Sequence, residues 1–266
     1  MAVDGGSVHG LTVRTATVRG RSHMQTGEER HDAYVVRTDP ALPWIVAVVA
    51  DGVSSSMNAG EAAAEAVAHA GQLVLDRLRS EGPPDGPHWW TGVFERTAIA
   101  IAAHTEGLPR REPPAARRRM MEPSPAATTL AVLVAPAEPT RDLRLFSAVV
   151  GDSRILRLHD GAWSALLDAR DSTTGSDRVQ TLPRHPEAMC ATESVWRQDE
   201  VLVLATDGFA DAIGPASPLA LALADRWRRP PSLPGFLRDV DFRKATYNDD
   251  RTVIALWQGN ADSAVA

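Results

Sequence analysis

The segment WIVAVVADG at residues 44–52 carries the pattern that decides the fold of this chain. A continuous apolar, β-branched run is followed at once by an acidic residue and a glycine, which predicts a buried strand that ends in a turn. Three other segments have an apolar run with an acidic residue at one end: FSAVVGD at 146–152, EVLVLATDG at 200–208 and DDRTVIALW at 249–257. We therefore expect four buried strands, each with a carboxylate at one end.

Strands and helices are expected in blocks. Three strands precede any helix, at residues 11–20, 33–38 and 44–50. Two amphipathic helices follow, the first about five turns long with Asn58 as its N-cap and the second from about 89 to 104. The remaining segments are strands at 128–135, 143–151, 153–161, 200–208 and 251–257 and short helices at about 218–227 and 233–240. This grouping favours an α+β domain with antiparallel sheets.

One domain is expected over residues 11–258, between a flexible N-terminal tail at 1–10 and a C-terminal tail at 259–266. Within it, residues 107–125 read as a surface loop because they hold five arginines and five prolines without a period. The segment at 167–195 also lacks a period, and long irregular stretches inside a domain are often functional loops.

Composition narrows the function classes. The 266 residues carry a net charge of −6, which gives no cationic field for nucleic acid or anionic lipid. The single cysteine, Cys190, excludes an intramolecular disulfide and fits a reducing compartment. No signal peptide and no apolar run of spanning length are visible. We expect a soluble, cytoplasmic protein with no nucleic-acid or membrane partner.

The strand-end carboxylates suggest a metal site. A bare carboxylate at the rim of an apolar core is costly unless it is paired or bound to a cation. Several converging carboxylates would repel one another, and Mg²⁺ or Mn²⁺ prefers oxygen ligands such as these. For any single Asp-Gly pair, an ordinary turn is the alternative reading. The candidates are Asp51, Asp152, Asp207 and Asp249.

Six segments in this order resemble the metal-dependent protein phosphatases, the PPM or type 2C serine/threonine phosphatase family, in a bacterial subgroup. They are RGRSHMQTGEERHDA (19–33), VADGVSSS (49–56), AATTLAVLV (126–134), VVGDSRILRL (149–158), LATDGFAD (204–211) and YNDDRTVIAL (247–256). The resemblance implies a four-layer α-β-β-α sandwich of two antiparallel sheets flanked by helices. It also implies two Mg²⁺ or Mn²⁺ ions at one end of the sandwich.

Site roles follow from the resemblance, position by position. It implies that Asp51 bridges the two ions, that Gly52 offers its carbonyl group, and that Asp207 and Asp249 hold the first ion. Asp152 matches a third, weaker metal site, and Asp32 matches the acidic residue that orients the attacking water. The implied reaction is hydrolysis of a phosphate monoester by a water activated between the two metal ions. Cys190 then has no catalytic role.

The chain departs from the family pattern at several positions. His31 stands before Asp32 where the family usually has Glu, Gln or Asn. The family's DGxGG turn is DGVSS here, so serines replace two glycines, and Val53 stands where some members have a histidine that is a candidate acid. Gly27 occupies the usual spacing of the arginine that grips the substrate phosphate. Arg30 or Arg21 could replace that arginine or be an ordinary surface residue, and His23 could be a hydrogen-bonded core histidine.

The leading prediction is a phosphoserine/phosphothreonine protein phosphatase that acts as a monomer on a phosphorylated protein. The alternatives are a weakly active or inactive regulatory module on the same fold and a phosphatase of small metabolites. In the enzyme reading, the segment at 167–195 is a flap beside the active site that sets substrate choice through Arg170, Arg178 or Arg184.

Overall fold

The computed structural model describes residues 1–111, 124–138, 143–167, 179–214, 217–243 and 247–259. Within these residues, strands form two antiparallel sheets, in the order β1-β2-β11-β10-β7-β8 and β3-β4-β5-β6-β9. The strands are β1 (Ala2–Val8), β2 (Leu11–Val18), β3 (Asp32–Thr38), β4 (Trp44–Asp51), β5 (Leu130–Pro136), β6 (Leu143–Val150), β7 (Arg154–His159), β8 (Ala162–Leu167), β9 (Cys190–Trp196), β10 (Val201–Ala205) and β11 (Arg251–Gln258). The helices are α1 (Arg21–Thr26), α2 (Ala59–Ser80), α3 (Pro87–Glu106), α5 (Asp207–Ala210), α6 (Pro218–Arg226) and α7 (Leu233–Val240), with a 3₁₀ turn at Pro186–Ala188.

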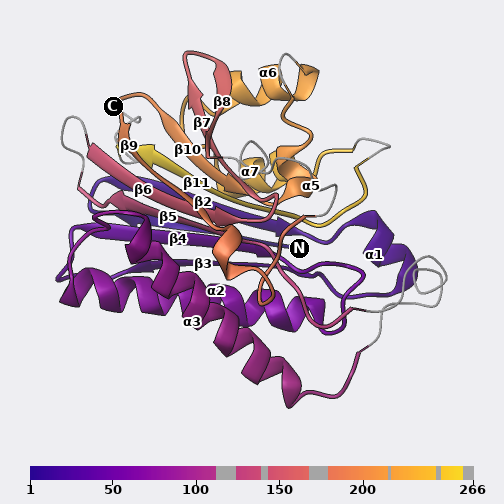
Figure 1. Ribbon diagram of the computed structural model, residues 1–266. Coiled ribbons are helices and arrows are strands. Elements are labelled where there is room, and N and C mark those ends of the chain that lie inside the picture. The colour runs from indigo at the N-terminus through magenta and orange to yellow at the C-terminus, as the bar shows by residue number, and fades with distance from the viewer. Residues whose placement is uncertain (112–123, 139–142, 168–178, 215–216, 244–246, 260–266) are drawn as a thin grey trace.

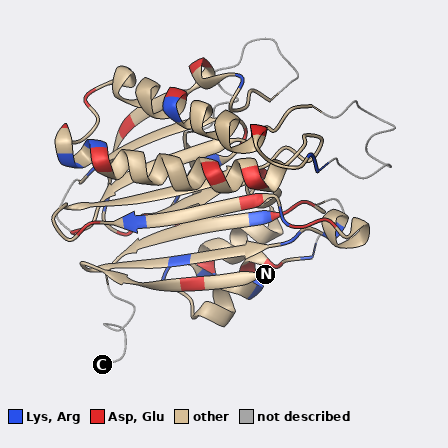
Figure 2. Ribbon diagram, turned by 90° about the horizontal axis from the view of Figure 1, so that it is seen from below, with Lys and Arg blue, Asp and Glu red and all other residues tan. Residues whose placement is uncertain are grey.

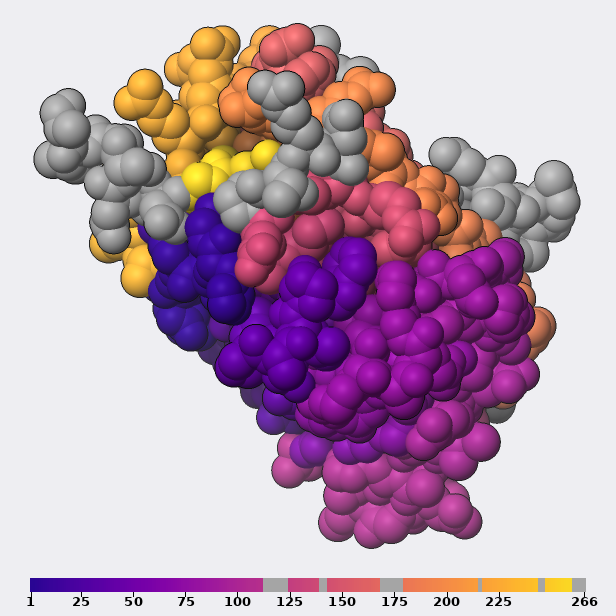
Figure 3. Space-filling view, turned by 90° about the vertical axis from the view of Figure 1, so that its left-hand side faces the viewer, coloured from indigo at the N-terminus to yellow at the C-terminus, as the bar shows by residue number. Residues whose placement is uncertain are grey.

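The elements stack in four layers (Figure 1). Helices α2 and α3 cover the outer face of the five-stranded sheet, the six-stranded sheet packs on its inner face, and α6 and α7 lie beyond that second sheet. This is the expected α+β sandwich. In Figure 3 the indigo N-terminal residues lie next to yellow residues near the C-terminus, in keeping with the pairing of β2 with β11.

Burial on both faces explains the continuous apolar runs. On β4, Val46, Val48 and Ala50 face the helices, whereas the alternate residues Ile45, Ala47 and Val49 face the other sheet. Because successive side chains of a strand point to opposite faces, a strand between two layers needs apolar residues at every position. Lys, Arg, Asp and Glu lie mainly on helix surfaces and at strand ends (Figure 2).

Four local expectations are corrected. Residues 2–8 of the expected N-terminal tail form β1, which pairs with β2 along its whole length. Helix α1 lies between β2 and β3, so only two strands precede the first helix. The segment at 167–195 contains the start of β9, which pairs with β6. Asn58 sits before α2, but its side chain accepts a hydrogen bond from the Arg111 backbone N–H instead of capping the helix.

Other expectations lie largely outside the described residues. This holds for most of the loop at 107–125, for Arg170 and Arg178, and for the tail after residue 259. No helix among the described residues combines the length and apolar character that crossing a membrane requires.

Candidate functional site

Asp32 and Asp51 lie side by side because of the strand register. They are direct partners in the antiparallel pair β3–β4. The end of β4 is held by Thr129, whose Oγ1 accepts a hydrogen bond from the Asp51 N–H at 3.0 Å and whose N–H donates to the Asp51 carbonyl at 2.8 Å. The backbone of Asp51 is therefore held by the hydroxyl and the N–H of Thr129, the residue just before β5.

Thr206 connects the two sheets behind this pair. Its Oγ1 donates to Asp32 Oδ2 at 2.8 Å and accepts from the Thr252 N–H at 2.9 Å. Thr206 immediately follows β10, so the residue after it, Asp207, is carried to the same end of the sandwich as Asp51. The buried Thr206 hydroxyl thus fixes Asp32 of the five-stranded sheet next to the ends of β10 and β11 in the other sheet.

Four of the predicted ligands face one cavity of about 740 Å³: Asp51, Asp152, Asp207 and Asp249. Asp32 does not line this cavity and is only 3% exposed, so it lies behind the others. Polar residues that the sequence did not single out also line it, among them Ser22, Asp211 and Tyr247. In the sequence, only their position in or close to the SH, TDG and NDD motifs points to a role in the site.

Burial and mutual repulsion shape the electrostatics of this cavity. The pKa of Asp51 lies well above its ordinary value, because the group is buried and because Asp32, Asp207, Asp249 and Asp152 repel its negative charge. The pKa of Asp207 rises to about 7, by burial and by repulsion from Asp152 and Asp249. The pKa of Asp32 is raised by burial and by Asp250. Without a counter-charge, burial and the neighbouring carboxylates thus favour the protonated form of these carboxyl groups more than water does.

The donor set fits hard divalent cations. The oxygen Oδ1 of Asp207 is buried and has no hydrogen-bond partner among the described residues, as is also true of Oδ1 of Asp32. Buried carboxylate oxygens are normally hydrogen-bonded or bound to a cation. An all-oxygen set suits Mg²⁺ or Mn²⁺ better than zinc. The residues present are therefore suited to the metal that the sequence suggested.

Gly52 and Gly208, which follow Asp51 and Asp207, allow the backbone to pack closely against neighbouring segments. A Cβ at Gly52 would lie 2.3 Å from the Ala59 carbonyl oxygen, and a Cβ at Gly208 would lie 2.0 Å from that of Asp250. Neither glycine has a positive φ. Gly52 is not among the residues that line the cavity, and its role as a carbonyl ligand stays a prediction. Close backbone approach, rather than turn geometry, requires glycine at both positions.

The proposed phosphate-gripping arginines lie elsewhere. Arg30 donates from Nε to the Asp32 carbonyl oxygen at 2.8 Å, and neither Arg30 nor Arg21 lines the cavity. Arg184 and Cys190 do not line it either, although Val179 of the expected flap does. Among the described residues that surround the cavity there is no lysine or arginine.

Asp250, which the sequence did not single out, organises the loops around the site. It is 2% exposed and accepts three hydrogen bonds, from His23 Nδ1 at 2.9 Å and from the backbone N–H groups of Gly20 and His31, each at 2.6 Å. Burial alone would raise the pKa of Asp250, but these donors lower it below its ordinary value. The second aspartate of the NDD motif is thus a structural anchor. His23 is the hydrogen-bonded core histidine that the sequence allowed.

Comparisons with known proteins agree with the fold. Similar solved structures include RsbX in complex with magnesium (13% identity, TM-score 0.56, covering 96% of this chain and 98% of that one). PppA, a regulatory component of the T6SS in Pseudomonas aeruginosa, has 16% identity and a TM-score of 0.58, with 95% and 99% of the two chains covered. The serine/threonine phosphatase of S. agalactiae has 14% identity and a TM-score of 0.55, with 93% and 99% covered. At these identities the likeness concerns the fold.

A search of curated proteins finds no match. The sequence itself matches the family model described as protein phosphatase 2C over residues 19–232, which is most of the chain and includes Asp32, Asp51, Asp152 and Asp207. The chain belongs to the protein phosphatase 2C family.

Proposed function

We propose that this protein is an active, Mg²⁺- or Mn²⁺-dependent phosphatase of phosphoserine and phosphothreonine in proteins. The observation that carries the proposal is the convergence of four carboxylates from both sheets on one cavity, where burial and repulsion from neighbouring carboxylates raise the pKa of Asp51 and Asp207. Such a cavity stabilises bound cations strongly, because a cation removes the repulsion between its ligands.

Asp51, Asp207, Asp249 and Asp152 would hold the ions. Divalent ions in such a site lower the pKa of water and neutralise the charge of the phosphoryl oxygens. Asp51 and Asp207 must lose their protons before they can act as ligands, so ion binding and proton release are coupled. Asp32 has no place on the cavity wall and acts as a positioning residue, since it receives the Thr206 hydroxyl that aligns the two strand ends.

Hydroxyl groups take part in binding the substrate. Ser22, Ser54, Ser55 and Tyr247 line the cavity. The Ser22 and Tyr247 hydroxyls donate to the carbonyl oxygens of Asn248 and Asp211, so the proposed donors to phosphate oxygens are Ser54 and Ser55. Because no cationic side chain among the described residues lines this cavity, the charge of the phosphate would be balanced mainly by the metal ions. This favours substrates with one dianionic phosphate on a neutral hydroxyl group, as in phosphoserine and phosphothreonine.

The missing arginine also favours the second candidate, a regulatory member of the family that binds metal but turns over weakly. The two candidates differ in turnover and agree in metal binding. A small-metabolite phosphatase would share the site but prefer substrates without a peptide.

The test is Mn²⁺-dependent release of phosphate from p-nitrophenyl phosphate, a phosphothreonine peptide and a panel of phosphorylated metabolites. Asp51→Asn and Asp207→Asn should lose this activity, whereas Asp225→Asn, an exposed aspartate on α6, should keep it. Calorimetric titration with Mn²⁺ accompanies each assay. Mn²⁺ binding without turnover would favour the regulatory candidate. Faster turnover of a metabolite than of the peptide would favour the small-metabolite phosphatase. Absence of both binding and turnover would refute the metal centre.

A further inference from the structure

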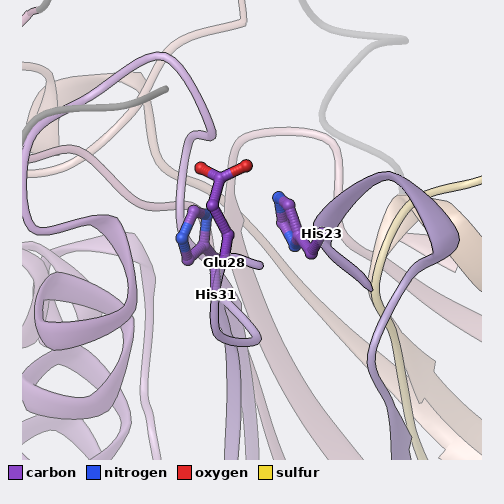
Figure 4. A group of neighbouring side chains, drawn as sticks. All are labelled: His23, Glu28 and His31. Atoms are coloured by element: carbon purple, nitrogen blue, oxygen red, sulfur yellow. The ribbon is translucent and has the colours of Figure 1, made fainter. Parts of the chain in front are cut away.

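A second cluster of potential metal ligands lies next to the carboxylate cavity. His23 of α1, Glu28 of the following loop and His31 just before β3 bring three ligand atoms within 4.8 Å of one another. The two imidazole rings are 4.3 Å apart between centroids and inclined by 52°. Figure 4 shows Glu28 beside His31, with its carboxylate above the two rings. Among the described residues, no other group of three such side chains is this compact.

Asp250 sets the orientation of the first histidine. An ionised carboxylate only accepts hydrogen bonds, so the 2.9 Å contact with Asp250 Oδ2 makes His23 Nδ1 the donor. In the neutral ring the other nitrogen, Nε2, carries the lone pair, and it faces Ser54 Oγ at 3.4 Å. A carboxylate that holds one nitrogen of a metal-binding histidine, so that the other is presented to the ion, is the usual outer-shell arrangement of such sites.

The same carboxylate fixes the second histidine. Asp250 Oδ2 also accepts the His31 backbone N–H at 2.6 Å, so one buried group anchors the backbone of His31 and the ring of His23. The ligand atoms around a tetrahedral zinc ion with bonds of about 2.0–2.1 Å are roughly 3.3 Å apart. Each pair of ligand atoms in the cluster would therefore have to approach by about 1.5 Å at most.

The chemistry of this cluster differs from that of the carboxylate cavity. Two imidazoles and one carboxylate suit zinc and similar transition metals, whereas the cavity of aspartates suits Mg²⁺ or Mn²⁺. Glu28 and His31 line their own cavity of about 290 Å³, which shares only Ser54 with the larger one among the described residues. An ion could therefore reach the cluster without passing the carboxylates.

We propose that His23, Glu28 and His31 form a binding site for a zinc-class transition-metal ion, separate from the carboxylate centre. Three protein ligands leave a fourth position for water. The site ties α1 and the loop before β3 to the anchor at Asp250, beside the mouth of the main cavity. This inference does not depend on the proposed phosphatase activity.

The experiment measures zinc binding in a background where the carboxylate centre is disabled. Asp51→Asn/Asp207→Asn protein, stripped with a chelator and checked for folding by circular dichroism, is titrated with Zn²⁺ against a chromophoric competitor. We expect one equivalent to bind, and Co²⁺ loading to give visible absorption bands of a low-coordinate site. Adding Glu28→Gln or His31→Gln should weaken binding by at least about tenfold, the loss that follows even from removal of an outer partner.

A matched control is Glu29→Gln, since the adjacent Glu29 is 60% exposed and pairs with Arg111. It should leave the zinc affinity unchanged. Substituting Glu28 and His31 avoids reliance on the fully buried His23, whose replacement could prevent folding. The proposal is overturned if the double variant binds no zinc, or if zinc binding is the same in the Glu28→Gln and Glu29→Gln proteins.

Discussion

Asp207→Asn should make the metal-free protein more stable, although it removes a proposed metal ligand. The pKa of Asp207 rises from an ordinary value of 3.8 to about 7 in the folded protein. A raised carboxyl pKa means that the folded state binds the proton more tightly than the unfolded state. Its contribution to stability is complete below the unfolded pKa and is lost as the pH rises through the folded one.

The size of the effect follows from the shift. One pKa unit corresponds to about 1.4 kcal/mol, so ionising Asp207 in the folded protein costs up to about 4 kcal/mol. The free energy of unfolding gained by the asparagine should grow from roughly 2 kcal/mol at about pH 5 to roughly 4 kcal/mol at about pH 8. These are upper limits, because Asp152 and Asp249, which repel Asp207, can take up protons themselves.

The assay is urea unfolding in the presence of a chelator at both pH values, with Asp225→Asn as a control for loss of one negative charge. Mn²⁺ should then raise the stability of the wild type and leave the Asp207→Asn variant nearly unchanged, since a ligand stabilises only the state that binds it. An asparagine variant no more stable than the wild type at the higher pH would refute the reasoning. So would a gain that does not change with pH.

Three further substitutions test the packing around the site. Gly208→Ala should lower the melting temperature and Mn²⁺ affinity, because its Cβ would lie 2.0 Å from a backbone oxygen, whereas Gly214→Ala, with open space around it, should change neither. Thr206→Val should cost about 1–3 kcal/mol in urea unfolding, since it leaves Asp32 without its hydroxyl donor. Trp227→Ala should cost about 3–5 kcal/mol in the same assay, because Trp227 is fully buried under α6 and α7. Equal stability of any of these three with the wild type would contradict the corresponding contact.

The strands that line the two-sheet core were predictable from the sequence because their positions are buried on both faces. β4 and β10 have apolar residues at every position from Ile45 to Ala50 and from Val201 to Ala205. Edge strands lack that signal. β1 reads AVDGGSV and leaves most of its residues exposed or half-exposed, so only its pairing with β2 makes it a strand.

The carboxylates of the site were predictable for the same reason, whereas their surroundings were not. An aspartate at the end of a buried strand stands out against the apolar run. The anchoring role of Asp250 depends on three donors from residues 20–31, more than 200 positions away along the chain, and no local pattern reveals such contacts. Likewise, the positions of Arg21 and Arg30 off the cavity depend on the path of α1 and its following loop.

The carboxylates repel one another across the interface between the two sheets, so the proposed cations would have a structural role as well as a chemical one. Asp51 ends a strand of the five-stranded sheet, Asp207 and Asp249 flank strands of the six-stranded sheet, and Asp152 lies where the chain crosses from β6 to β7. Repulsion among these charges therefore acts to separate the sheets at this end, and Thr206 is the hydroxyl that opposes it by joining Asp32 to β11. Ions bound by carboxylates of both sheets would reverse the sign of this interaction and hold the sheets together. Stability and activity should for this reason depend on divalent ions over the same range of concentration.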